Sequence, residues 1–376
     1  MRKIVYLSGT RADFGLMRQT LLTLQDAPEF DVSVAAVGMH LDPDYGMTVE
    51  DIERSGLPIC ARVPLDFSVT NGAAMARGVG ELTIALTDVF ERERPWLVLL
   101  LGDRGEMLAG AIAAVHLNLP IAHIHGGERS GTVDESVRHA ISKLAHFHFT
   151  TTPGARERLL RMGERPETVS VSGAPGLDKL GELELKSRAA LCASLGFDAQ
   201  LPLALFLYHP DLYDPGAADF MLPMVATLER AGVQMLILKP NADAGSERIR
   251  ARIEEVADHP AVRVVTHLER SAYLSWMAAA DVLVGNSSSG IIEAASFDTP
   301  VINVGQRQRL RERNANVADV DHDLTLFEQA LKQALTHQRS AQPSNIYGDG
   351  RAAEHICTRL QQLEIEPHHL SKVNAH

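Results

Sequence analysis

Two short apolar runs, at 96–101 and 120–124, are each followed at once by side chains that can move protons. Asp103 comes after the first run and His125 after the second. Carboxylates and imidazoles are common general acids and bases in enzymes. Asp103 also fits the N-cap of a following helix, a position that aspartate often occupies. The pair therefore indicates acid–base chemistry, with helix capping as the alternative for Asp103.

More charged side chains stand at the start of the helix expected after the second run. Asp134 and Glu135 open this helix, and Arg138 and His139 follow at i+4. Acids at a helix start complement the helix dipole, and i, i+4 partners can be plain surface ion pairs. As a group behind adjacent strand ends, however, they predict a catalytic crevice, because open α/β sheets place their chemistry beyond the carboxyl ends of strands.

The second half of the chain carries a segment suited to phosphate. Residues 285–290 read Gly-Asn-Ser-Ser-Ser-Gly after an apolar run. Ser287, Ser288 and Gly290 would place hydroxyls and free amides at a helix N-terminus, which favours anions. Glu293 follows one turn later, where it could hold ribose hydroxyls. The alternative is a hydroxyl-rich N-cap with Glu293 as its capping partner.

Four further residues lie where strands are expected to end. Arg11 stands in a glycine-containing loop after the first strand and suits a phosphate or diphosphate. His209 and Asn241 each follow an apolar run, and Arg307 adds positive charge after a glycine. Arg11 equally fits a solvated surface turn, and His209 an ordinary loop position.

Neither metal nor dinucleotide sites are expected from the motifs. The 16 histidines form no HExxH motif, and the His-x-His pairs at 123/125 and 146/148 lack a third ligand close in sequence. The loop after the first strand has no G-x-G-x-x-G fingerprint. The three cysteines are far apart and fit neither a disulfide framework nor a zinc site, which favours a reducing cytoplasm.

Bulk composition excludes several classes of protein. The net charge of −12 argues against a nucleic-acid surface, which is normally basic. No run approaches the ~18 apolar residues of a membrane span. The N-terminal segment is apolar for only four residues and predicts a strand rather than a signal peptide. We therefore expect a soluble cytoplasmic protein.

Apolar runs and amphipathic helical patterns alternate along the chain, and the alternation restarts near 202. This rhythm predicts parallel sheets covered by helices, with the last strand at 300–304. The 376 residues exceed one ordinary core. We expect an α/β fold of two Rossmann-like domains, at 1–172 and 173–351, with a helix at about 352–376 able to pack back on the first.

In their order along the chain, these motifs resemble those of the hydrolysing UDP-N-acetylglucosamine 2-epimerases of the sialic-acid and legionaminic-acid pathways. The matching segments cover nearly the whole length: Gly9-Thr10-Arg11-Ala12-Asp13, Gly102-Asp103-Arg104, Gly126-Gly127-Glu128, Ser130-Gly131-Thr132-Val133-Asp134, Ser136-Val137-Arg138-His139, His209-Pro210, Pro240-Asn241 and Gly285-Asn286-Ser287-Ser288. The resemblance implies a glycosyltransferase-B fold with the active site in a cleft between the domains, a nucleotide-sugar substrate, a homodimer, and neither metal nor NAD.

The reaction that the resemblance implies removes the C2 proton of the sugar while the nucleoside diphosphate leaves C1. Water then adds to the resulting 2-acetamidoglucal, so UDP-N-acetylglucosamine would give UDP and free N-acetylmannosamine. Asp103 and Asp134 match acid–base carboxylates of the family. Arg138 and His209 match further functional positions, with His209 near the leaving phosphate.

The resemblance also implies how the nucleotide is held. The matching positions are Arg11, Ser287 and Ser288 for the diphosphate, Glu293 for the ribose, and Asn241 and Arg307 for the nucleotide side. A retaining glycosyltransferase of the same fold is an alternative, because it would use the same nucleotide cradle. A nucleotide-sugar sensor without catalysis is a third reading.

One position departs from the family pattern. Many members have a glutamate, a presumed acid–base residue, where this chain has His125. An imidazole can also carry a proton near neutral pH. The substitution resembles a branch thought to act on UDP- or GDP-linked 2,4-diacetamido-2,4,6-trideoxyglucose, which makes that sugar the alternative substrate.

Overall fold

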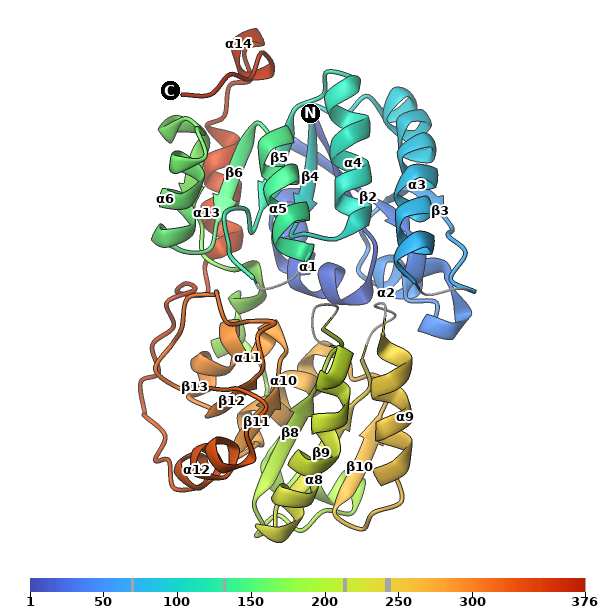
Figure 1. The fold of residues 1–376 in the computed structure, drawn as a ribbon. Helices are drawn as coiled ribbons and strands as arrows, with labels where there is room; N and C mark the ends of the chain where they lie inside the picture. The colour runs from blue at the N-terminus through green and yellow to red at the C-terminus, as the bar shows by residue number, and fades with distance from the viewer. Residues whose placement is uncertain (69–70, 131–132, 212–214, 241–244, 376) are drawn as a thin grey trace. The chain divides into compact units, whose positions relative to one another are not determined.

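The structure is a computed structural model that describes residues 1–68, 71–130, 133–211, 215–240 and 245–375 (Figure 1). The chain forms two compact units. Unit 1 comprises Met1–Arg129, Val133–Lys179 and Tyr347–His376, and unit 2 comprises Ser130–Thr132 and Leu180–Ile346. The fold is therefore α/β with two parallel-sheet domains, as the alternation of strands and helices predicted.

Unit 1 is built on a parallel sheet in the order β3-β2-β1-β4-β5-β6-β7. Its strands are β1 (Arg2–Ser8), β2 (Phe30–Val37), β3 (Ile59–Val63), β4 (Leu97–Leu101), β5 (Ile121–Ile124), β6 (Phe147–Thr150) and β7 (Val169–Val171). The order reverses between β1 and β4, and such a switch point opens a crevice at the carboxyl ends of the strands.

Helices cover both faces of this sheet (Figure 1). They are α1 (Arg11–Asp26), α2 (Val49–Arg54), α3 (Gly72–Glu93), α4 (Gly105–His116), α5 (Val133–Leu144), α6 (Pro153–Arg161) and α13 (Ala352–Gln361); the short α14 (Pro367–Leu370) follows α13 and buries none of its residues. Alternate residues of β1 face opposite cores: Ile4 and Tyr6 pack with α1 and α13, whereas Val5 and Leu7 pack with α3 and α4. Strands buried on both faces explain the continuous apolar runs.

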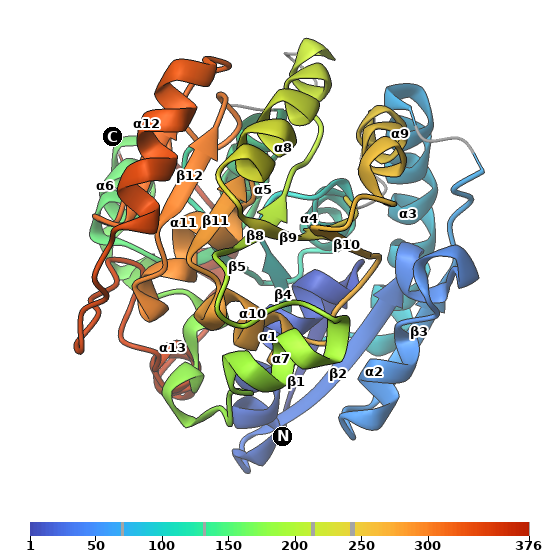
Figure 2. The same cartoon turned by 90° about the horizontal axis from the view of Figure 1, so that it is seen from below.

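Unit 2 repeats the plan with a sheet in the order β10-β9-β8-β11-β12-β13. Its strands are β8 (Leu203–Leu207), β9 (Gln234–Leu238), β10 (Val262–Val265), β11 (Val282–Gly285), β12 (Val301–Val304) and β13 (Val317–Val320). Its helices are α7 (Arg188–Leu195), α8 (Met221–Arg230), α9 (Ser246–Val256), α10 (Arg270–Ala279), α11 (Ser288–Ile292) and α12 (Leu324–Leu335). Helices α8, α9 and α12 pack on one face and α7 and α10 on the other (Figure 2).

The expectation that 300–304 is the last strand was wrong, because β13 follows it at the edge of the sheet. This strand pairs with β12 from Val317 to Val320, and most of its side chains are partly or fully exposed. An edge strand packs on one side only, so it lacks the apolar run that marked the interior strands.

The C-terminal helix α13 completes the core of unit 1. Its residues Ile356 and Leu360 are buried in the same cluster as Leu21 and Leu24 of α1. The carboxylate of Asp178 accepts the N–H groups of Ala352 and Ala353, at 2.6 and 2.7 Å, and so caps the helix. Residues 173–179 and 347–351 group with unit 1, whereas the sequence placed them in the second domain.

A neutral histidine links β5 to its neighbours in unit 1. His123 is fully buried; its Nε2–H donates to the Gly102 carbonyl at 2.7 Å, and its Nδ1 accepts the Ser142 hydroxyl at 3.0 Å. Burial lowers the pKa of His123 to about 3. The imidazole therefore joins β5, the loop after β4 and α5 without carrying charge near neutral pH.

Among the residues that the structure describes, no helix is long and apolar enough to cross a membrane.

The packing of α13 predicts that Leu360→Ala lowers the free energy of unfolding by about 2–4 kcal/mol, because it leaves a cavity in the unit 1 core. Chemical denaturation measures the change. Gln362→Ala, at an exposed position one residue beyond α13, is the matched control and should change stability by less than about 0.5 kcal/mol. Equal effects of the two substitutions would contradict the packing described here.

The buried His123 predicts a loss of stability in acid. Between pH 6.5 and about 3 the unfolded chain binds a proton at this position that the folded chain does not bind. The free energy of unfolding therefore falls with decreasing pH, by up to about 1.4 kcal/mol per pH unit from this group. Denaturation at pH 7, 6 and 5 should show a shallower dependence for His123→Gln than for the wild type, and equal slopes would refute the assignment.

Candidate active site

The carboxyl ends of β4, β5 and β6 bring together several of the residues singled out from the sequence. The guanidinium of Arg138, on α5, donates to the carboxylate of Asp103 and, at 3.2 Å, to the backbone carbonyl of Glu128. Arg138 is 1% exposed, whereas the Asp103 side chain is 24% exposed. Since a buried cation is costly unless it is paired, this contact ties α5 to the loops after β4 and β5.

Asp103 does not cap α4, which was the alternative role predicted for it. The N-cap of α4 is Arg104, which makes no side-chain capping bond, and the carboxylate of Asp103 faces Arg138 instead. Glu135 and His139 do lie together on α5, with Nε2 of His139 3.7 Å from the Glu135 carboxylate, and burial lowers the pKa of His139. Asp134 lies partly exposed in the first turn of that helix.

His125 lies in a sharply turned loop directly after β5. Its backbone has a φ of 65°, a left-handed conformation that a side chain rarely adopts. Gly127, two residues on, has a φ of 76°, and a Cβ there would lie 2.3 Å from the Ala155 carbonyl oxygen. Such strain is concentrated at functional sites in proteins. The loop thus holds His125 in one place at the carboxyl edge of the sheet.

The carboxylate of Glu128 is the partner of His125. Its Oε1 lies 3.1 Å from Nδ1 of His125 and accepts the hydroxyl of Thr151 at 2.8 Å. Glu128 is 4% exposed, and Thr151, just after β6, is also buried. The sequence predicts no role for Glu128 beyond its place in a motif, because only the turn of the loop brings its carboxylate next to the imidazole.

In the loop after β1, which carries Arg11, two backbone amides are bound by a side chain of the same loop. The N–H groups of Gly9 and Thr10 donate to Oδ2 of Asp13, at 3.0 and 2.7 Å. Asp13 thus stabilises the start of α1 from within the chain, in a capping box with Thr10. Arg11 itself pairs with Asp51 of α2 at 2.7 Å. The amides of Gly9 and Thr10 are thus already bound within the chain, and the use of Arg11 for a phosphate stays a prediction.

In unit 2, Ser287 and Ser288 lie where β11 gives way to α11. Ser287 is the N-cap of α11 and accepts the N–H of Ser289, so the capping alternative holds for this residue. Gly285 has a φ of 140°, and a Cβ there would lie 1.8 Å from the Leu207 carbonyl oxygen, which only glycine permits. Gly290 follows in α11, packed on Val301 of β12.

Glu293 is not the capping partner of this turn. It lies at the C-terminal end of α11, is 3% exposed, and forms an ion pair with Arg270 of α10. A carboxylate held by a guanidinium can still accept a hydrogen bond from a hydroxyl, because its two oxygens offer several lone pairs. The geometry is thus compatible with a sugar hydroxyl as a further partner.

An asparagine joins the loops after β8, β11 and β12. The buried Asn286 accepts the His209 N–H at 2.7 Å and donates to the His209 carbonyl at 2.9 Å. Arg307 donates to the Asn286 carbonyl at 3.0 Å. No role for Asn286 was predicted from the sequence, yet Asn286 binds the backbone of His209 and the side chain of Arg307. Asn241, the remaining predicted residue, lies outside the described residues.

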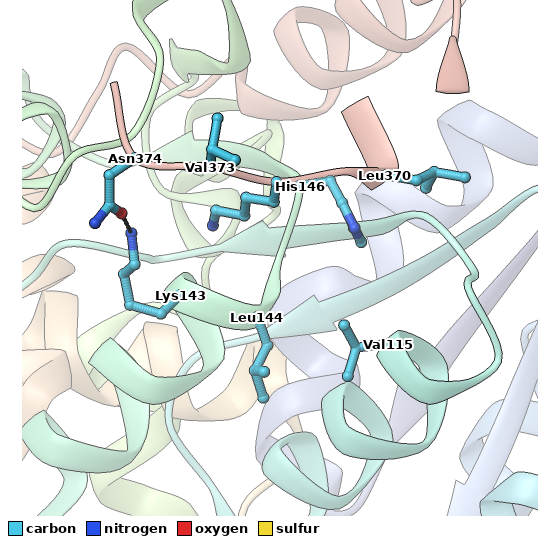
Figure 3. A pocket seen from close by; sticks show the side chains of 8 residues that line it. Val115, Lys143, Leu144, His146, Leu370, Val373 and Asn374 are labelled. Atoms are coloured by element: carbon cyan, nitrogen blue, oxygen red, sulfur yellow. Dashed lines mark hydrogen bonds between the residues drawn. The ribbon is translucent and has the colours of Figure 1, made fainter. Parts of the chain in front are cut away.

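A separate cavity of about 270 Å³ lies at the opposite edge of the unit 1 sheet, near His146, which precedes β6 (Figure 3). Its lysines already have partners. Lys143 donates to Met162, Glu164 and Asn374, and Lys372 donates to Ser142, Ala145 and Glu164. We therefore interpret this cavity as part of the attachment of the C-terminal segment. No group of three or more metal-ligating side chains occurs in the described part of the chain.

Comparisons with known proteins agree with this picture. The model of the UDP-N-acetylglucosamine 2-epimerase family matches residues 22–361. The chain is 46% identical to a hydrolysing UDP-N,N′-diacetylbacillosamine 2-epimerase from Legionella pneumophila over the full length of both proteins. It is 31% identical to a hydrolysing GDP/UDP-N,N′-diacetylbacillosamine 2-epimerase from Campylobacter jejuni, over 88% of this chain and 87% of that protein.

A solved structure shares the fold. The UDP-N-acetylglucosamine 2-epimerase of Neisseria meningitidis, bound to UDP-N-acetylglucosamine, matches with a TM-score of 0.81 and 18% identity, over 96% of this chain and 100% of that one. The two parallel-sheet domains are thus of the glycosyltransferase-B type, as expected. Together with the matches along the sequence, this likeness shows that the chain belongs to the UDP-N-acetylglucosamine 2-epimerase family and is a UDP-sugar 2-epimerase.

Proposed function

We propose that this protein hydrolyses UDP-N,N′-diacetylbacillosamine with inversion at C2, giving UDP and free 2,4-diacetamido-2,4,6-trideoxymannose. The observation that carries this proposal is the 46% identity, over the full length, to a relative named for that reaction. His125 supports it, because it replaces the glutamate of many family members and resembles the branch with this sugar. We therefore prefer the diacetamido sugar nucleotide, the alternative substrate predicted from the sequence, to UDP-N-acetylglucosamine, the main one.

The chemistry calls for proton transfer on both faces of the sugar ring. One group takes the C2 proton as the C1–O bond breaks, and the electron pair of that bond leaves with UDP. Water then adds at C1, and a second group returns a proton to the opposite face of C2. We assign these transfers to Asp103, His125 and Asp134, with Arg138 holding Asp103 in place.

The nucleotide needs charge and hydrogen bonds rather than proton transfer. Negative charge grows on the diphosphate as it leaves, and positioned cations and hydroxyls stabilise it. We assign this task to Arg11, His209, Ser287 and Ser288, and the ribose to Glu293. Gly290, Asn241 and Arg307 complete the proposed nucleotide contacts.

A second candidate substrate is UDP-N-acetylglucosamine. The family model and the structural relative bound to that sugar nucleotide favour it. A glycosyltransferase of the same fold is less well supported, because it has no need for several acid–base groups around the donor C2. The two epimerase readings share one mechanism and differ only in the sugar.

The proposed reaction predicts solvent hydrogen at C2. In D₂O, UDP-N,N′-diacetylbacillosamine should give UDP and a free sugar that carries deuterium at C2, measured by NMR and mass spectrometry. We expect its kcat/KM to exceed that of UDP-N-acetylglucosamine by about tenfold or more, since binding sites distinguish substrates by the polar groups they pair. The same assay with GDP-linked N,N′-diacetylbacillosamine compares the two nucleotides, because the sequence left open whether UDP or GDP is bound.

Three outcomes would count against the proposal. A product without deuterium would rule out proton exchange at C2. Release of UDP only in the presence of an acceptor sugar would indicate a glycosyltransferase. A higher kcat/KM for UDP-N-acetylglucosamine would restore that sugar as the substrate.

His125 is expected to be essential for turnover. His125→Ala should lower kcat at least about a hundredfold, the scale of a lost general acid or base. Steady-state kinetics measure the change, and His116→Ala, at the exposed end of α4, is the control that should keep its kcat. Near-normal turnover of His125→Ala would make His125 a structural loop residue only.

A further inference from the structure

The contact between His125 and Glu128 has a chemical consequence. A carboxylate oxygen can only accept hydrogen bonds, and Oε1 of Glu128 lies 3.1 Å from Nδ1 of His125. Nδ1 must then carry the proton of a neutral imidazole, which leaves the lone pair on Nε2. We infer that Glu128 is a positioning residue that sets the tautomer of His125, an inference that rests on the proposed acid–base role of His125.

Hydrogen-bond donors surround the Glu128 side chain and its loop. The Thr151 hydroxyl donates to Oε1, the same oxygen that faces His125, at 2.8 Å. Guanidinium groups from two helices bind the adjoining loop: Arg138 at the Glu128 carbonyl and Arg158 at the Gly127 carbonyl. An oxygen that already accepts a hydroxyl keeps a lone pair for the imidazole N–H. This geometry makes Glu128 an acceptor toward His125.

The backbone prevents the two side chains from separating easily. His125 and Glu128 are three residues apart in a loop whose strained φ angles are set by tight packing. The Gly127 position admits no side chain, and the His125 N–H is held by the Phe149 carbonyl of β6 at 3.0 Å. The loop therefore presents the imidazole already oriented, before any substrate binds.

This arrangement explains how histidine can stand where many relatives have glutamate. A glutamate at position 125 would bring its own negative charge, whereas an imidazole becomes a cation when it takes a proton. The carboxylate of Glu128 stabilises that cation, as the aspartate does in a Ser-His-Asp triad. The acid–base unit is thus the pair, with Nε2 of His125 as the atom that gains or loses the proton.

Nitrogen NMR tests the tautomer without any substrate. In the ¹⁵N-histidine-labelled full-length protein above pH 7, His125 should show a protonated Nδ1 and a bare Nε2. In Glu128→Gln the amide can donate to Nδ1, so the proton should move to Nε2. A wild-type spectrum with the proton on Nε2, or a spectrum that Glu128→Gln leaves unchanged, would overturn the inference.

A double-mutant cycle separates positioning from simple loss of structure. Glu128→Gln should lower kcat at least tenfold with KM changed less than about threefold, and Thr151→Val should lower it by a smaller factor. In a His125→Gln background, Glu128→Gln should change kcat less than about twofold, because its partner is already gone. Equal losses in both backgrounds would show that Glu128 does not act through His125.

A matched control exists in the same unit. Glu164 is also buried and lies 3.0 Å from a different histidine, His148 of β6. Glu164→Gln should lower the melting temperature but leave kcat within about twofold of the wild type. The two proposals fail separately: a wild type without epimerase activity refutes the proposed function, while the NMR spectra still decide the tautomer.

Discussion

The buried guanidinium of Arg138 is the constraint on which the carboxyl edge of unit 1 depends. A cation that is 1% exposed needs compensation, and Arg138 finds it in the Asp103 carboxylate and the Glu128 carbonyl. These partners belong to the loops after two adjacent strands, and Arg138 itself belongs to α5. If either loop or α5 shifted, a charged or polar group would lose its partner. The positions of the two loops, which carry the proposed acids and bases, are therefore fixed relative to each other.

The fold could be predicted well because its strands are buried on both faces. Runs such as 97–101 and 203–207 contain no polar residue, which marks a parallel sheet even without knowledge of its neighbours. The edge strand β13 packs on one side only and was therefore missed. The boundaries between the units lie at 179/180 and 346/347, whereas the sequence predicted 172/173 and 351/352. Asp178 caps α13 through contacts that no local sequence pattern reveals, and this joins residues 173–179 to unit 1.

The position of several predicted site residues could be read from the sequence, whereas their contacts could not. Asp103 and His125 follow apolar runs and Arg138 lies in the next helix, and the structure places all three at the carboxyl edge of the unit 1 sheet, because strand ends converge in any parallel sheet. Their catalytic roles stay a prediction. The roles of Asp13 and Asn286 were missed: Asp13 accepts the N–H groups of Gly9 and Thr10, and Asn286 binds a residue 77 positions away in the sequence. Such roles depend on tertiary contacts, which spacing alone does not encode.

The return of the chain to its first unit has a consequence for synthesis on the ribosome. Unit 2 forms one nearly continuous stretch, 180–346, inserted between the parts of unit 1. Its sheet can close while the polypeptide is still growing, whereas the first-made unit keeps an apolar face on α1 uncovered until Ile356 and Leu360 emerge. The N-terminal unit is therefore the last to be finished, and a ribosome that stalls late would leave its hydrophobic surface open to aggregation.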